Sequence, residues 1–333
     1  MSNLNDVLTP LPNLEDPSSI QQSGSDADKS RVVDADNPVW GAGGALLLWI
    51  ASFAVQAIIP LLFIIPFAIQ RGLNPSSPDF GREAILLATT DRTAILLQVI
   101  SILPTHILTL GLLWAFVTRF GKRPFLASFG WGWSRIYGRW EALGLVALGV
   151  ALFIIGGTLA KLLGSDKPTQ LEQIINSSTG ARYAIAALAV FTAPFVEEFV
   201  YRGVLYSGLK RGFGELVALV ARFVFKVNLT LERQRAIGMN AAIVFVLGLF
   251  TLIHVPQYWP NLGVIAAVAL LSIVLTLIRA YSGRLLPCIV IHMSFNAVQA
   301  LLLIFEPYIQ RLLPTTPPAV PTSMLLPLVR CIF

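Results

Sequence analysis

The sequence predicts an all-α fold, a polytopic bundle of about seven transmembrane helices with an additional amphipathic helix at the membrane interface. Of the 333 residues, 55% are hydrophobic and only 13% are charged, whereas soluble domains of ordinary composition carry about 25% charged residues. The mean hydropathy is +0.72. A chain with so little charge is expected to hide its surface in lipid, and its apolar residues fall in runs of spanning length.

A helix needs about 20 mainly apolar residues to cross the hydrocarbon core of a bilayer. Segments that meet this requirement are residues 42–69, 94–117, 142–163, 183–209, 238–255, 261–279 and 285–306. Pro60 and Pro66 predict a kink in the first of them that neighbouring helices must accommodate. Residues 213–227 are too short and too basic to span, and they predict the interfacial helix.

The distribution of basic residues predicts that the N-terminus lies in the cytoplasm, and the expected location of this integral protein is the plasma membrane. In this orientation the inside segments hold 16 of the 24 bases and the outside segments hold eight, in agreement with the excess of Lys and Arg in cytoplasmic loops. The bases stand in short segments between apolar runs, so the expected counter-charge is an anionic lipid headgroup and not nucleic acid. No signal-peptide pattern precedes the first span, which is expected to act as the insertion signal.

Ionisable residues inside three of the spans form a set. Such residues are costly in a membrane and usually face a cavity or a partner. The set has a pair of acids and an arginine in the fourth span, a Phe and a His in the fifth, and a His and an Asn in the seventh: Glu197, Glu198, Arg202, Phe250, His254, His292 and Asn296. The remaining histidine of the three, His106, lies in the second span without an evident partner.

Helix geometry places the side chains of Glu197 and Glu198 on different faces. Residues four apart share a helix face, so Arg202 is expected to pair with Glu198, while adjacent side chains diverge by about 100°. Glu197 is therefore left available for chemistry. Taken singly, the Glu198–Arg202 pair favours a structural ion pair, and Asn296 favours an interhelical hydrogen bond. Taken together, the residues of the set favour a functional site that faces a cavity.

The chemistry that these side chains could perform is hydrolysis of a peptide bond inside the membrane. A carboxylate can act as general base on a water molecule. A His ring or an Asn amide can donate hydrogen bonds to a developing oxyanion, and a second His can orient the water or protonate the leaving amine.

At these residues the sequence resembles the CPBP family, which comprises CAAX prenyl endoproteases and bacteriocin-processing or immunity proteins. Its signature is E-E-x-x-x-R, F-x-x-x-H and H-x-x-x-[ND] on successive membrane helices, and the three parts occur here in that order over roughly 183–300. The resemblance implies an intramembrane endopeptidase acting on membrane-associated or lipidated peptides. It implies that Glu197 activates water, that His254 holds it, and that His292 and Asn296 line the oxyanion site, with Glu198, Arg202 and Phe250 in support.

The resemblance also gives the predicted domains. They are an acidic tail without fixed structure at 1–38, an N-terminal transmembrane region at 39–140, a CPBP-like core at 141–310 and a C-terminal tail at 311–333.

Two questions stay open at the level of sequence. No cofactor is favoured, because an H-E-x-x-H helix is absent from the sequence, but Glu197, His254 and His292 are residue types that bind zinc. The function could also be that of a catalytically silent immunity factor or membrane scaffold, or of a proton-coupled transporter.

One observation resists the predicted site. If the fifth span begins near Ile237 on the cytoplasmic side, His254 lies about 25 Å deep at 1.5 Å per residue. Glu197 belongs to a span that enters from the opposite side and should lie nearer the cytoplasm. Either the fifth helix begins deeper or tilted, or the site reaches past the middle of the membrane.

Overall fold

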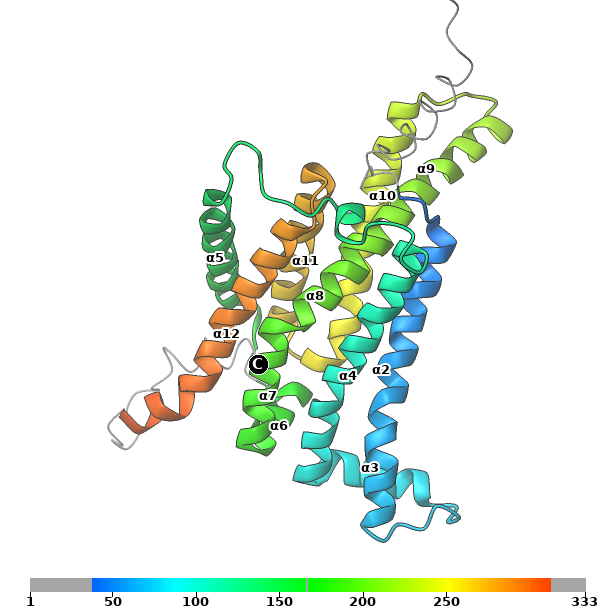
Figure 1. Cartoon of the computed structure of the whole chain (residues 1–333). Helices are drawn as coiled ribbons and strands as arrows, with labels where there is room; N and C mark the ends of the chain where they lie inside the picture. The colour runs from blue at the N-terminus through cyan, green and yellow to red at the C-terminus, as the bar shows by residue number, and fades with distance from the viewer. Residues whose placement is uncertain (1–37, 166, 313–333) are drawn as a thin grey trace, which may run out of the picture. The chain divides into compact units, whose positions relative to one another are not determined.

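The computed structural model describes residues 38–165 and 167–312, with side chains described to residue 309. The predicted tails at 1–38 and 311–333 lie almost wholly outside these ranges. Regular structure within the described residues is helical throughout (Figure 1), which confirms the all-α fold class.

Six helices are long and apolar enough to cross a membrane. They are α2 (Ala42–Gln70), α4 (Arg92–Thr118), α5 (Trp140–Leu163), α10 (Leu231–Tyr258), α11 (Leu262–Ser282) and α12 (Leu286–Leu312). A seventh span is possible if a bent pair of segments, residues 179–191 and 193–223, counts as one. The protein is therefore an integral membrane protein with the predicted type of helical bundle. The shorter elements are α3 (Phe80–Thr90), η1 (Leu126–Phe129) and α6 (Gln170–Ser177).

The fourth predicted span is not one straight helix. It consists of α7 (Thr179–Phe191), α8 (Ala193–Glu197), the π-helix η2 (Glu198–Leu205) and α9 (Tyr206–Phe223), and it bends by 41° between α7 and α8. Pro194 explains the break, because a proline lacks the backbone N–H and its ring clashes with the carbonyl four residues earlier.

The predicted interfacial helix at 213–227 is not a separate element. Its residues to Phe223 continue α9 without interruption, because the backbone of α9 packs closely on α10. Gly214 lies so near α10 that a Cβ atom there would be 3.0 Å from the carbonyl oxygen of Gln234.

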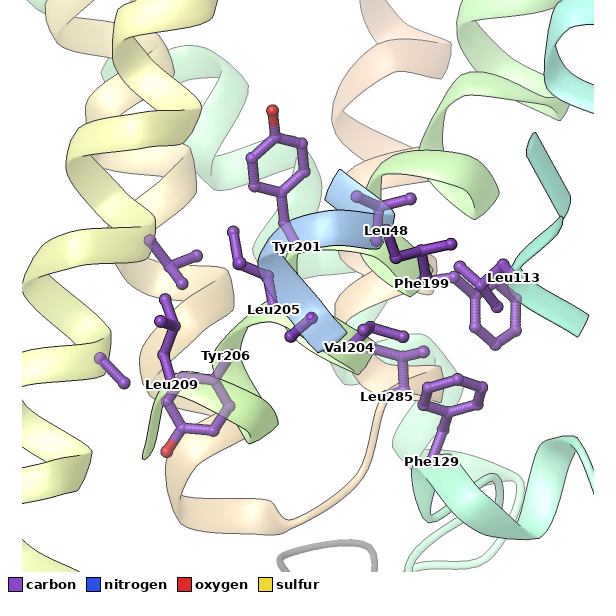
Figure 2. Packing of buried hydrophobic residues seen from close by; sticks show 14 of the residues in the cluster. Leu48, Leu113, Phe129, Phe199, Tyr201, Val204, Leu205, Tyr206, Leu209 and Leu285 are labelled. Atoms are coloured by element: carbon purple, nitrogen blue, oxygen red, sulfur yellow. The ribbon is translucent and has the colours of Figure 1, made fainter. Parts of the chain in front are cut away.

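The largest hydrophobic cluster surrounds η2. Figure 2 shows Tyr201, Val204 and Leu205 of this segment beside Leu48 of α2, with Phe199 beside Leu113 of α4. All eight residues of η2 are buried, so the segment that follows Glu197 is fixed from several sides.

The loop between α4 and α5 closes one end of this cluster. The ring of Phe129 lies 5.0 Å from that of Phe199, centroid to centroid, and the backbone N–H of Leu285 donates to the Phe129 carbonyl at 3.2 Å. Gly203 provides the space, because a Cβ atom at that position would come within 2.8 Å of the Phe129 ring.

Candidate active site

The π-helix supplies the backbone of the site. Its hydrogen bonds join residues five apart, which is rare in proteins and frequent at functional sites, whereas the spacing of the motif predicts α-helical geometry. Side chains donate to three successive carbonyls here. Ser207 Oγ bonds Gly203 O at 2.7 Å, Trp40 Nε1 bonds Val204 O at 3.1 Å and Arg279 Nε bonds Arg202 O at 3.2 Å.

Glu198 and Arg202 form the ion pair that their spacing predicts. Arg202 Nη1 lies 3.1 Å from Glu198 Oε1, and both side chains are fully buried. The guanidinium also donates to Ser272 Oγ at 2.8 Å and to Thr276 Oγ1 at 3.4 Å, and it lies 4.2 Å above the ring of Phe250. Each of the three guanidinium nitrogens of Arg202 thus donates at least one hydrogen bond, which fixes Arg202 as the partner of one acid.

His292 connects the two acids. Its Nδ1 lies 2.8 Å from Glu198 Oε1, and its Nε2 lies 3.8 Å from Glu197 Oε2. An ionised carboxylate only accepts hydrogen bonds, so Nδ1 carries a proton. The side chain of Glu197 is 26% exposed whereas that of Glu198 is 0% exposed, so Glu197 is the acid that water can reach.

His254 lies beside Phe250. Its Nδ1 is 2.7 Å from the Phe250 carbonyl oxygen, and the two rings lie 4.5 Å apart, centroid to centroid. A carbonyl cannot donate, so Nδ1–H is the donor, and in the neutral ring Nε2 is then an acceptor.

The register of α10 against η2 and α9 resolves the difference in depth that the sequence raised. Gly238 of α10 packs on the backbone of Gly214, and further along α10 Phe250 contacts the ring of Tyr201 at 5.1 Å, so α10 runs antiparallel to η2 and α9. His254 lies one turn beyond Phe250, and Glu197 lies about one turn before Tyr201. The two residues are therefore at the same level.

Asn296 makes the interhelical hydrogen bond that it favours when taken singly. Its Nδ2 donates to the carbonyl of Ala189 at 2.8 Å. Ala189 is in the last turn of α7, where carbonyls lack partners within the helix. In this structure Asn296 therefore ties α12 to the end of α7, and the second N–H of its amide can serve a ligand.

Sequence reasoning missed three further polar residues around the ion pair. Ser272 and Thr276 are four apart in the apolar run of α11, a spacing that could have indicated a polar stripe. Arg279 is the third residue; it and Arg202 are among the 16 bases of the inside segments, but both are fully buried. Without these two, the 16 bases of the inside segments become 14 against eight outside.

The third histidine also has a partner. His106 of α4 lies 2.8 Å from Thr192 Oγ1 through its Nδ1, at the break between α7 and α8. No signal in the sequence joins these residues, because they are 86 positions apart.

The three residues that could bind zinc by residue type, Glu197, His254 and His292, do not form a metal-binding group among the described residues. Among the described residues, no group of three or more His, Cys, Asp or Glu side chains has the geometry to hold a metal ion. We therefore derive no step through a metal.

The comparison with protein families decides the assignment. Residues 179–298 match the model of the family described as type II CAAX prenyl endopeptidase Rce1-like. The match supports the assignment of residues 179–298 to the CPBP, or CAAX protease, family. The CPBP segment begins at α7 and ends within α12, so it contains all seven residues of the predicted set. No curated protein and no solved structure matches the chain.

Proposed function

We propose that this CPBP protein is an intramembrane endopeptidase that hydrolyses membrane-associated or lipidated peptides with a water molecule activated by Glu197. The observation that carries the proposal is the contrast between two adjacent acids. Glu198 is fully buried and paired with Arg202, whereas Glu197 is partly exposed beside His292.

In the proposed mechanism Glu197 removes a proton from water. The other O–H of the water donates a hydrogen bond to His254 Nε2, which orients the nucleophile. The hydroxide oxygen bonds to the peptide carbonyl carbon, the C–N bond breaks, and Glu197 returns its proton to the leaving amine. His292, protonated on both nitrogens, donates from Nδ1 to Glu198 and from Nε2 to the oxyanion, which the free N–H of Asn296 also faces.

The charges in this proposal balance. Glu197 and Glu198 are negative, and Arg202 and His292 are positive. A low-dielectric site tolerates buried charges when they are paired and hydrogen-bonded. Glu198 meets that condition through Oε1, which accepts from Arg202 and His292, while its Oε2 is buried without a hydrogen-bond partner among the described residues. We further propose that the N-terminus is cytoplasmic and that the protein resides in the plasma membrane, on the basis of the 14 to eight distribution of bases.

The test is a cleavage assay with the full chain in liposomes. The panel pairs a peptide with a prenylated cysteine near its C-terminus with the same peptide unmodified, and adds an apolar transmembrane peptide. Mass spectrometry identifies the bond that is cut. We expect cleavage of at least one peptide by the native protein and none by Glu197→Gln. Cleavage that is equal for both proteins would come from a contaminant, and no cleavage by either would favour the silent scaffold.

A chelator gives a second prediction. Because Glu197, His254 and His292 do not assemble as a ligand group in this structure, incubation with 1,10-phenanthroline followed by desalting is expected to leave the cleavage rate unchanged. The rate and the zinc content by elemental analysis are measured together. Loss of activity that added Zn²⁺ restores would contradict the metal-free mechanism.

A further inference from the structure

Side chains from two other helices, α12 and α4, form hydrogen bonds at the C-terminal end of α7. Asn296 of α12 donates to Ala189 in the last turn of α7, and His106 of α4 contacts Thr192, the residue at the 41° break. Helix α8 lies between α4 and α12 and contacts both (Figure 1). His106 lies outside the family segment 179–298, so this contact joins the N-terminal region to the CPBP core.

The direction of the His106 hydrogen bond follows from its partner. Thr192 Oγ1 lies 3.1 Å from the carbonyl oxygen of Leu188, to which it donates its one hydroxyl hydrogen. With this hydrogen on the Leu188 carbonyl, the hydroxyl oxygen accepts from Nδ1–H of His106 at 2.8 Å. This arrangement selects the His106 tautomer that carries its proton on Nδ1.

The bend between α7 and α8 determines the position of Glu197. Pro194 removes one backbone hydrogen bond across it, so the bend depends on side-chain contacts there more than a regular helix would. Glu197 ends the five-residue helix α8, which rises about 7.5 Å from Thr192, and a change of about 10° in its direction would move Glu197 by about 1.3 Å. A displacement of about 1 Å can cost roughly 100-fold in rate.

We infer that His106 is a positioning residue, which fixes the α7–α8 break through Thr192 and thereby aims Glu197 at the substrate. The inference rests on the proposed peptidase function for its rate effects, but the contact itself can be tested without activity.

The experiment compares two replacements that differ in the position of one N–H group. The amide nitrogen of His106→Asn can take the place of Nδ1, whereas that of His106→Gln can take the place of Nε2. We expect His106→Phe, His106→Gln and Thr192→Val to lower kcat by about 100-fold with KM unchanged. We expect His106→Asn and Thr192→Ser to remain within about threefold of the native protein, because each keeps its half of the hydrogen bond.

The double variant His106→Phe/Thr192→Val distinguishes a shared contact from two separate effects. Residues in one hydrogen bond are not additive, so the double variant is expected to be no slower than either single one. Rescue by glutamine but not asparagine would show that Nε2 acts directly, and losses that multiply would show independent effects. Either result overturns the inference.

Thermal unfolding in detergent separates this inference from the proposed function. His106→Phe and Thr192→Val are each expected to lower Tm by about 2 °C, and the double variant by no more than the larger of these two shifts. If the native protein cleaves no peptide, the proposed function fails while this coupling still tests the contact. Additive shifts in Tm would overturn the positioning role whether or not the protein is active.

Discussion

Replacement of Glu197 with glutamine is expected to reduce peptide cleavage by about 100- to 10,000-fold, the usual contribution of general base catalysis, because the amide cannot take a proton from water. The protein should remain folded and inserted. The Glu197 side chain is 26% exposed, and its ion-pair contact, with His292, is as long as 3.8 Å. We expect Tm to stay within about 2 °C of the native value. Cleavage of a membrane peptide and thermal unfolding in detergent are the two measurements.

Glu198→Gln is the matched control for this prediction, because it makes the same chemical change at the adjacent residue. Glu198 accepts from Arg202 at 3.1 Å and from His292 at 2.8 Å, in a fully buried position. Its replacement leaves the guanidinium without a counter-charge, so activity and Tm should fall together. If Glu197→Gln kept native cleavage while Glu198→Gln lost it, the roles of the two acids would be reversed.

The sequence was sufficient for features that depend on local spacing. The lengths of the apolar runs predicted the spans, and the four-residue separation of Glu198 and Arg202 predicted their ion pair. The contact survives in a π-helix that the sequence did not reveal, because the buried guanidinium is also held by Ser272 and by the ring of Phe250.

Features that depend on tertiary packing could not be predicted. The π-helix is stabilised by donors to its carbonyls, among them Trp40 and Arg279, which come from distant parts of the chain. The common level of His254 and Glu197 depends on the antiparallel packing of α10 on α9. Hydropathy also cannot distinguish a buried arginine from one at the membrane surface, which is why Arg279 was misplaced.

Replacement of Arg202 with alanine is expected to destabilise the protein more than replacement of Glu197, His106 or Thr192. Removal of one partner of a buried ion pair costs about 3–5 kcal/mol, because it leaves an uncompensated charge. The change also removes the hydrogen bonds to Ser272 and Thr276 and the contact with the face of Phe250. We expect Tm in detergent to fall by more than about 6 °C, together with loss of cleavage. Arg202→Lys should recover only part of the loss, since an ammonium group cannot reproduce the planar fork of donors.

Arg211→Ala provides the matched control, because Arg211 pairs with Glu215 at the same four-residue spacing and at 2.7 Å. That pair is 41% and 63% exposed, and exposed pairs contribute only about 0–1 kcal/mol. Arg211→Ala should therefore change Tm by about 2 °C or less. Equal shifts for Arg202→Ala and Arg211→Ala would show that burial gives the Glu198–Arg202 pair no special weight. In that case the two acids would not be separated into a structural and a reactive one, and the assignment of Glu197 as the base would lose its physical reason.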